Sequence, residues 1–318
     1  MVALVLDTDL AMGAPGSDID DGFALALAVA DPDIDLIAVT TVNGNTDVDT
    51  ATILTGELLR RLDRQDIPVH RGAELPLLRP RARPRPPAPD VADPDFRGTT
   101  PEPAAAALVR LIRDNPHQIT IAAVGPLTNI ALALRLDPGI AELIREVVVM
   151  GGVFLGQTNR RDMPGEFNIW VDPEAAQIVV GSGVPLRFVG LDVTLRVRVS
   201  TADAQALEDS DSPFARFAGQ HTRAWIAHQA EAHPGSEVDR DSCAMHDPLA
   251  VAAVTHPELL QWAPAHVAFA TGSERTRGIA VADLLDSSTP PEPNCRIATD
   301  VDAEAFRAHF ISRIQSIR

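Results

Sequence analysis

Short apolar segments rich in β-branched residues alternate along the chain with segments of helical periodicity. The apolar segments predict strands at 2–6, 36–42, 119–124, 147–150 and 185–193. Helical patterns fall between them, at about 21–30, 47–62, 102–113, 127–136 and 173–181. Repeated strand–helix units predict an α/β fold with a mostly parallel sheet flanked by helices on both faces. Ligands of such sheets bind outside the carboxyl ends of the strands.

The remaining regions show different patterns. Residues 76–103 include nine prolines, which exclude a regular helix or an interior strand and predict a long surface loop. A helix is expected within 212–235, where it ends at a Pro-Gly pair. Beyond residue 264 we expect short strands and then a final amphipathic helix at 302–316. The sequence shows no internal repeat, so we expect residues 1–318 to form one domain.

The composition is that of a globular protein with an acidic surface. Hydrophobic residues make up 45% of the 318 positions and charged residues 22%, which is enough apolar material for a core. The formal net charge is -17, and every basic residue is Arg because the chain contains no Lys. Since an acidic surface repels phosphate backbones, we expect no nucleic-acid partner.

The N-terminal sequence MVALVLDTD predicts a strand rather than a targeting segment. It lacks the basic region of a signal peptide and meets an Asp after five apolar residues. No apolar run approaches the roughly 20 residues that span a bilayer. Cys243 and Cys295 are too few for a disulfide framework and lie outside any zinc-binding spacing. We therefore expect a cytoplasmic protein with no membrane partner.

Five aspartates lie within the first 21 residues. Asp7 and Asp9 end the first predicted strand, and Asp18, Asp20 and Asp21 lie where the next helix begins. Capping a helix needs one or two carboxylates, whereas five so close together repel one another unless protons or a cation neutralise them. A bound divalent cation is the simplest explanation, and all-oxygen ligands favour Ca²⁺ or Mg²⁺ over zinc.

Three later segments place polar groups at predicted strand ends or helix starts. The sequence GPLTNIA at 125–131 follows a strand and opens a helix, which leaves backbone carbonyls free to complete a calcium site. Glu166 and Asn168 lie in a polar loop before a helix, and His246 and Asp247 directly precede another. Each segment alone is typical of helix capping or ordinary loop polarity. Together with the aspartates, they become candidate site residues.

Two aspartates after a first strand are also typical of the haloacid-dehalogenase phosphatases. In that family the first Asp is a nucleophile and a Lys from a later segment steadies the phosphoryl group. Because this chain contains no Lys, the phosphatase interpretation ranks second.

The motifs taken together resemble the inosine-uridine-preferring nucleoside hydrolases. The resemblance runs in order from about residue 4 to 255 and includes the aspartate cluster, TTVNGN, GPLTNIA, MGG followed by EFN and DPEAA, and HDPLAV. It implies a Rossmann-like fold, a tightly bound Ca²⁺, and hydrolysis of the N-glycosidic bond of ribonucleosides to ribose and free base. It also implies a role in nucleoside salvage and a homodimer or homotetramer.

The resemblance also implies roles for individual residues. The metal ligands would be Asp9, Asp21, Asp247 and the carbonyl of Thr128. Asp9 would also accept the proton of the attacking water, and His246 would protonate the departing base. The ribose would be held by Asp20, Asn168 and Asp247 at its 2′- and 3′-hydroxyls, by Glu166 and Asn159 at its 5′-hydroxyl, and by Asn45 at the sugar side.

Three features depart from the family pattern. The insertion AMGAPGS enlarges the turn between Asp9 and Asp20, and a longer loop makes Arg160 a competitor of Asn159. The family's His after its third strand is replaced by VADPDFRGTTPEP, and no Tyr is present. The base contacts would then fall to other residues, with Trp225, His228 and Arg97 as candidates.

Two other functions remain open from the sequence alone. One is hydrolysis of a different N-riboside, with specificity set by the loop at 76–103. The other is a non-catalytic nucleoside or ribose sensor. The presence of Asp9, Asp21 and His246 together favours catalysis, because a sensor needs neither the base nor the acid.

Overall fold

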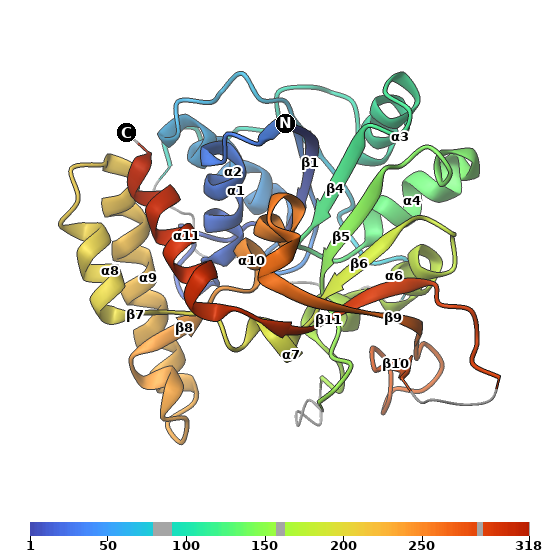
Figure 1. Ribbon diagram of the computed structural model, residues 1–318. Coiled ribbons are helices and arrows are strands. Elements are labelled where there is room, and N and C mark those ends of the chain that lie inside the picture. The colour runs from blue at the N-terminus through green and yellow to red at the C-terminus, as the bar shows by residue number, and fades with distance from the viewer. Residues whose placement is uncertain (79–90, 157–162, 285–288, 318) are drawn as a thin grey trace.

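A large, mostly parallel sheet forms the centre of the molecule (Figure 1). The computed structural model describes residues 1–78, 91–156, 163–284 and 289–317. Within these residues the sheet has the strand order β10-β9-β11-β6-β5-β4-β1-β2-β3. The strands are β1 (Val2–Thr8), β2 (Ile34–Thr41), β3 (Val69–Arg71), β4 (Ile119–Ala123), β5 (Glu146–Met150), β6 (Leu186–Val189), β9 (Leu260–Phe269), β10 (Ala280–Asp283) and β11 (Cys295–Val301).

Strands from β11 to β3 run parallel, whereas β9 pairs antiparallel with both β11 and β10. The carboxyl ends of β1, β2, β4 and β5 therefore lie at one edge of the sheet. The expected α/β fold with a mostly parallel, helix-flanked sheet is confirmed.

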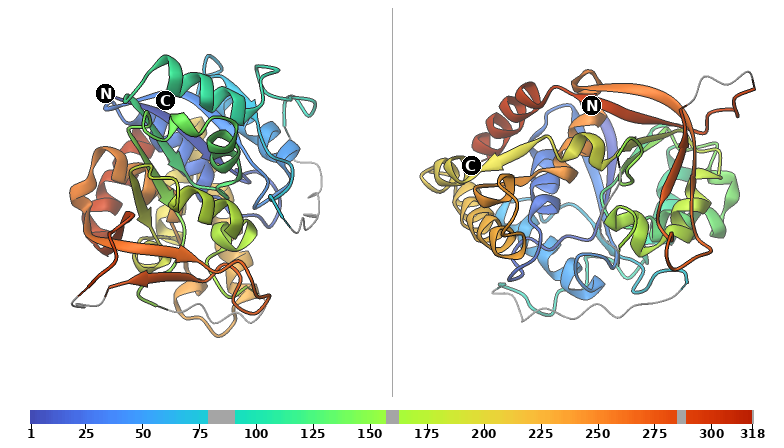
Figure 2. Two further views of the ribbon diagram at one scale, coloured as in Figure 1. Left: turned by 90° about the vertical axis from the view of Figure 1, so that its right-hand side faces the viewer. Right: turned by 90° about the horizontal axis from the view of Figure 1, so that it is seen from below.

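Helices cover both faces of the sheet, as the two views of Figure 2 show. One face is covered by α1 (Asp20–Ala30), α2 (Val48–Arg61), α10 (His246–Thr255) and α11 (Ala303–Ser316). The other is covered by α3 (Ala104–Asp114), α4 (Thr128–Leu136) and α6 (Pro173–Val180). Leu4 and Leu6 of β1 enter the first core and Val5 enters the second, because successive strand side chains point to opposite faces.

The remaining elements include short helices, a two-stranded sheet and one long helix. They are α5 (Phe167–Val171), α7 (Leu191–Thr194), the two-stranded sheet of β7 (Arg198–Ser200) and β8 (Ser242–Ala244), α8 (Thr201–Glu208) and the long helix α9 (Pro213–Ala232). No helix in the described residues is long and apolar enough to cross a membrane.

The single strand predicted at 185–193 is wrong in length. Strand β6 ends at Val189, and Leu191–Thr194 forms α7 after Gly190. A Cβ on Gly190 would lie 2.8 Å from the carbonyl oxygen of Gly152, so the chain turns here against a neighbouring backbone. Strands β3, β7 and β8 were not predicted, because three residues are too few to show an alternating pattern.

Helices α1 and α10 pack against each other, and α11 packs against both. Both α1 and α10 begin at the carboxyl edge of the sheet and end at the opposite edge. An eleven-residue helix such as α1 is roughly 16 Å long, so its two ends face separate parts of the molecule. The pair formed by α1 and α10 therefore places one set of residues at the carboxyl edge of the sheet and a different set at the opposite edge.

Candidate active site

Three aspartates from distant parts of the sequence meet where α1 and α10 begin. Asp20 and Asp21 open α1, and Asp247 lies in the first turn of α10. All three are buried, and each offers a carboxylate oxygen within 4.8 Å of the others. Grouped oxygens of this kind are suited to a divalent cation.

Asp9 lies directly beside this group, on the loop after β1, and its side chain is fully buried. Its Oδ2 accepts the backbone N–H of Asn45 at 2.6 Å, whereas its Oδ1 has no hydrogen-bond partner among the described residues. A Cβ on Gly44 would lie 1.9 Å from Asp9 Oδ2, and a Cβ on Gly125 would lie 2.9 Å from Oδ1. Both loops can close around this carboxylate only because these positions lack side chains.

Asn45 links two of the carboxylates. Its backbone bonds Asp9, and its Nδ2 donates to Oδ2 of Asp21 at 2.9 Å. The hydroxyl of Thr8 donates to the other oxygen of Asp21. The aspartates are therefore held in fixed orientations by the ends of β1 and β2.

Asp20 joins α1 to the start of α10. Its Oδ2 accepts the backbone N–H groups of His246 and Asp247 at 3.1 and 3.2 Å. Nδ1 of His246 lies 2.7 Å from the hydroxyl of Thr194, so Nε2 is the ring nitrogen left for a ligand. Burial lowers the pKa of His246, although the negative charge of Asp20 acts in the opposite direction.

Burial dominates the electrostatics of the cluster. It raises the pKa of Asp9 to about 7, and it raises the pKa of Asp21 and Asp247 well above the usual range. Neighbouring carboxylates raise these pKa values further, since each negative charge disfavours the next. A cation within the cluster would remove this repulsion, and the unpartnered Oδ1 of Asp9 offers it a free ligand atom.

Glu166 and Asn168 bring the loop after β5 to the same edge of the sheet. The buried carboxylate of Glu166 accepts the backbone N–H groups of Asn168, Ile169 and Gly152 at 2.8, 3.1 and 3.0 Å. Burial raises its pKa to about 7. Asn168 Nδ2 donates to the carbonyl oxygens of Val124 and Met150 at 2.8 and 3.2 Å, which leaves Oδ1 of Asn168 as an acceptor.

A cavity of about 540 Å³ opens above these residues. Its polar lining residues are Asp18, Asp20, Asn45, Glu166, Asn168, His246 and Asp247. Trp170 of α5, Trp225 and Gln229 of α9, and His233 directly after α9 also line it. The volume lies in the usual range of small-molecule sites, and the lining combines carboxylates with aromatic rings.

The structure brings together eight residues that the sequence nominated. They are Asp9, Asp20, Asp21, Asn45, Glu166, Asn168, His246 and Asp247. Asn159 and its competitor Arg160 lie outside the described residues. Of the suggested base contacts, Trp225 lines the cavity and His228 stacks on it at 5.3 Å between ring centroids. Arg97 is exposed and donates to carbonyl groups of its own loop.

Thr128, the expected carbonyl ligand, follows β4 at the carboxyl edge of the sheet. It is the first residue of α4, its hydroxyl donates to Asp172 at 2.8 Å, and it is not among the residues that line the cavity. Its carbonyl lies at the start of a helix, where carbonyl groups accept from the next turn. Val124, just after β4, does line the cavity, and its carbonyl oxygen meets Asn168. The carbonyl groups of Val124 and Thr128, on either side of the turn at 125–127, are therefore both candidates for a metal ligand.

Sequence reasoning missed Thr8, Gly44 and Thr194. Thr8 lies between Asp7 and Asp9, and Gly44 directly precedes Asn45. A polar or small residue next to a candidate ligand could have been recognised as part of the site. Thr194 reaches His246 from a different element, and no local pattern indicates this contact.

Asp7 holds together three elements that carry site residues or lie next to them. Its Oδ1 accepts from the hydroxyl of Thr40 at 2.5 Å and from Nδ2 of Asn129 at 2.7 Å, so it joins β1 to β2 and α4. Burial raises its pKa to about 6. Asp7 is fully buried, and its hydrogen bonds hold these elements together.

Comparisons with known proteins agree with this geometry. The family model for inosine-uridine preferring nucleoside hydrolases matches residues 4–308. A pyrimidine-specific ribonucleoside hydrolase RihA of Enterobacter sp. (strain 638) is 33% identical over 318 residues, covering 95% of this chain and 94% of that protein. The uncharacterized protein C1683.06c of Schizosaccharomyces pombe is 32% identical over 326 residues, covering 98% of each.

Solved structures share the whole fold. The plant nucleoside hydrolase PpNRh1 superposes with a TM-score of 0.86 at 28% identity and covers 99% of both chains. A purine-preferring ribonucleoside hydrolase from Gardnerella vaginalis gives a TM-score of 0.85 at 25% identity, covering 99% of this chain and 98% of that one.

The fold and the site together define an α/β enzyme whose acidic pocket can hold a metal ion. The chain belongs to the inosine-uridine-preferring nucleoside hydrolase family. It is an N-ribosyl hydrolase of the glycosidase class, as the sequence motifs predicted. The phosphatase interpretation is therefore wrong.

Proposed function

We propose that this enzyme hydrolyses the N-glycosidic bond of ribonucleosides to ribose and free base in a Ca²⁺-dependent reaction. The main support is the buried cluster of mutually repelling carboxylates at one end of a cavity of nucleoside size. Carboxylates around a sugar stabilise the positive charge of an oxocarbenium-like transition state. An acidic pocket therefore favours N-glycoside cleavage as well as cation binding.

We assign the metal to Asp9, Asp21, Asp247 and a backbone carbonyl after β4, which is that of Thr128, as expected, or that of Val124, which lines the cavity. The unpartnered Oδ1 of Asp9 and the oxygen-only ligands fit Ca²⁺. When bound, such an ion neutralises the cluster and lowers the pKa of a water beside the sugar. Mg²⁺ requires stricter octahedral geometry, so the two ions can be distinguished by comparing their affinities.

The chain's own residues supply the proton transfers and hold the ribose. Asp9, with its raised pKa, accepts the proton of the attacking water. Asp20, Asn168 and Asp247 line the cavity where they can bind the 2′- and 3′-hydroxyls. Glu166 is placed for the 5′-hydroxyl, and its three backbone hydrogen bonds keep it oriented. Asn45 orients Asp9 and Asp21 through its hydrogen bonds and lies on the side of the site where the sugar binds. Asn159 keeps its predicted role at the 5′-hydroxyl.

His246 is proposed to protonate the leaving base. Thr194 holds Nδ1, which directs Nε2 to the cavity that His246 lines. A free purine or pyrimidine anion is a poor leaving group, so a positioned acid accelerates its departure.

Trp225 and Gln229 of α9 are proposed to contact the base. Both residues line the cavity, and an aromatic ring there can stack on a planar base. One relative is named pyrimidine-specific and one structural neighbour purine-preferring, so the family allows either class of base. Replacing Trp225 by Ala should lower kcat/KM for nucleosides roughly tenfold more than kcat/KM for p-nitrophenyl riboside, and it should change which bases are preferred.

Release of ribose from a nucleoside panel is the decisive experiment. Uridine, cytidine, inosine, adenosine, guanosine and nicotinamide riboside are incubated with the Ca²⁺-loaded enzyme, and free ribose is quantified. Release from common ribonucleosides is expected, and it should stop on chelation and return with Ca²⁺. Release from nicotinamide riboside alone would support hydrolysis of another N-riboside. Nucleoside binding with no release would support a sensor and contradict the proposal.

We further propose a cytoplasmic salvage enzyme with one catalytic domain, assembled as a homodimer or homotetramer. These proposals rest on family membership. Light scattering at micromolar concentration tests the assembly, and a monomer near 34.0 kDa would contradict it.

A further inference from the structure

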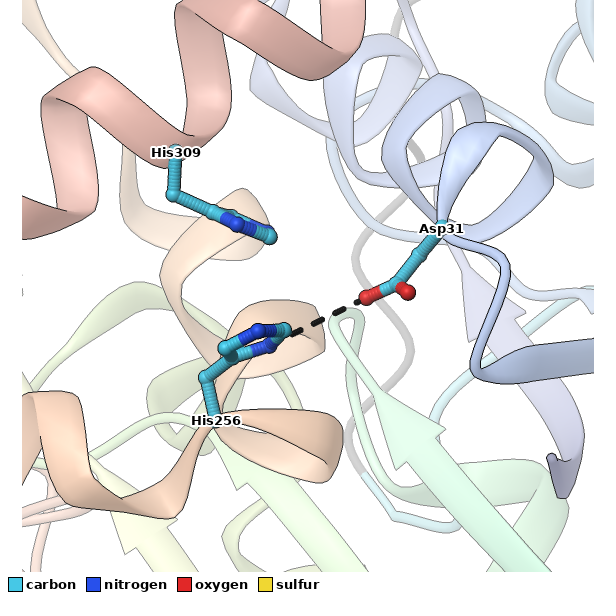
Figure 3. Close-up of side chains that lie close together, drawn as sticks. All are labelled: Asp31, His256 and His309. Carbon is cyan, nitrogen blue, oxygen red and sulfur yellow. Dashed lines mark ion pairs between the residues drawn. The ribbon is translucent and has the colours of Figure 1, made fainter.

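A second cluster of metal-ligand side chains lies at the other ends of α1 and α10. Asp31 follows the last residue of α1, His256 follows the last residue of α10, and His309 belongs to α11. Figure 3 shows the three side chains extending toward one another from three separate elements. Each offers one ligand atom, and these atoms all lie within 4.8 Å of one another.

The carboxylate of Asp31 is buried and held in place. Its Oδ1 accepts the backbone N–H of Asp33 at 2.9 Å, and its Oδ2 accepts the hydroxyl of Thr255 at 2.8 Å. The same Oδ2 lies 3.9 Å from Nδ1 of His256. A negative charge at a helix C-terminus is opposed by the helix dipole, so this carboxylate needs a positive partner.

The two imidazole rings lie against each other at a tilt, beside that carboxylate. Their ring centroids are 4.3 Å apart, with 48° between the ring planes. Nε2 of His309 is buried and has no hydrogen-bond partner within the described ranges. A buried ring nitrogen without a partner is unfavourable, and this one is available to bind a ligand.

Two charged groups outside the cluster also face His309. Arg313 lies one turn further along α11, and Glu258 lies in the segment after α10; their effects on the pKa of His309 oppose each other. Burial and the neighbouring His256 lower that pKa, which favours the neutral imidazole. A neutral imidazole is the form that binds a metal ion.

We propose that Asp31, His256 and His309 form a binding site for a divalent transition-metal ion of the zinc type. Two imidazole nitrogens and one carboxylate oxygen are a donor set that suits Zn²⁺ and leaves one position for water. Ligand atoms around tetrahedral zinc stand roughly 3.3 Å apart, judged from metal–ligand bonds of about 2.0–2.1 Å. Side-chain movements on the order of 1 Å would close the cluster onto the ion.

The ion would fasten the C-terminal helix to the body of the enzyme. Three ligands come from α11 and from the ends of α1 and α10, segments far apart in the sequence. Binding to the folded state alone stabilises that state, and the unfolded chain cannot bring these ligands together. This site is separate from the proposed Ca²⁺ site, because the two occupy opposite ends of the same helices.

The test uses the full-length enzyme with its carboxylate site saturated with Ca²⁺. Titration with Co²⁺ should give the visible absorption of an imidazole-ligated ion, with one ion per chain, and Zn²⁺ should displace it. At roughly a hundredfold excess over its dissociation constant, Zn²⁺ should raise the Tm by about 5 °C.

Single substitutions locate the ion. His309→Asn and His256→Asn should each weaken Zn²⁺ binding by at least about 100-fold. His266→Asn is the matched control, because His266 is an exposed histidine on β9. The Tm of His309→Asn without Zn²⁺, and its rate of nucleoside hydrolysis, should stay close to the wild-type values, which shows that the variant folds.

Either of two results would overturn the assignment. One is no Zn²⁺ or Co²⁺ binding by the Ca²⁺-saturated enzyme. The other is binding that survives both His309→Asn and His256→Asn, which would locate the ion elsewhere. Neither result depends on whether the enzyme cleaves nucleosides, so failure here leaves the proposed function unaffected.

Discussion

The two ends of the α1–α10 pair carry contrasting clusters. Where the helices begin, buried aspartates present only oxygen atoms, and backbone N–H groups of α10 help to hold Asp20. Where the helices end, two histidines and Asp31 present nitrogen and oxygen together. Helix N-termini stabilise carboxylates and helix C-termini stabilise cations, so the same two helices favour different ligands at each end.

This contrast suggests a division of roles between the two ends of the helix pair, with catalysis at one end and stabilisation of the fold at the other. Oxygen-only ligands select a hard cation, which suits a site that must organise water and sugar hydroxyls. Imidazole ligands select a transition metal, which binds tightly and suits a structural clamp. Each of the following experiments perturbs one end and uses the other as its control.

The largest effect is expected from Asp9→Asn at the catalytic end. The amide can still offer an oxygen to the metal but cannot accept a proton, so kcat should fall by at least roughly 10³-fold. Ribose-type inhibitors should still bind measurably. Asp31→Asn, at the opposite end, should keep kcat within a few-fold. Full activity in Asp9→Asn would show that another residue is the catalytic base, and Asp20 would be the first candidate.

His246 is the first residue of α10 and His256 follows its last residue, so substitutions at the two positions can be compared directly. His246→Ala should slow hydrolysis of inosine by roughly 10²- to 10⁴-fold, the range of general-acid catalysis. Cleavage of p-nitrophenyl riboside should change little, because its leaving group needs no proton. His256→Ala should leave both rates nearly unchanged. Equal losses on both substrates in His246→Ala would mean that His246 acts structurally.

Thermal unfolding should show a crossover between the two cations. Ca²⁺ should raise the Tm of wild type and of His309→Asn, but not that of Asp247→Asn. Zn²⁺, added to Ca²⁺-saturated protein, should raise the Tm of wild type but not that of His309→Asn. Each shift should be about 5 °C at a hundredfold excess of ion over its dissociation constant. One variant that loses both shifts would show that the sites are not independent.

The last prediction concerns the effect of pH on the stability of the metal-free enzyme. The pKa of Asp9 is raised by burial from 3.8 to about 7, so the folded state binds its proton more tightly than the unfolded state does. This stabilisation is complete below the unfolded pKa and is lost as the pH rises through about 7. Asp9→Asn should therefore gain stability relative to wild type between pH 5 and 8, by up to about 3 kcal/mol. Chemical denaturation at each pH measures this difference. Ca²⁺ should abolish it, and a constant difference across the range would contradict the raised pKa.

The local sequence determined the sheet, its flanking helices and the acidic character of the site. Alternating strand and helix patterns predicted the parallel sheet, and that sheet places Asp9, Asp20 and Asp21 at its carboxyl edge. His246 and Asp247 were found because they stand in a recognisable motif before a helix. Periodicity and motifs are local properties, so the order of residues is enough to reveal them.

Tertiary structure alone decided which groups meet. It placed Val124 in the cavity lining, with its carbonyl oxygen against Asn168. It brought Thr194 to His246, and His309 to Asp31 and His256, through the packing of α7, α10 and α11. Asp31, His256 and His309 share no motif and no spacing. Their convergence depends on how three helices pack, and no local pattern in the sequence records that packing.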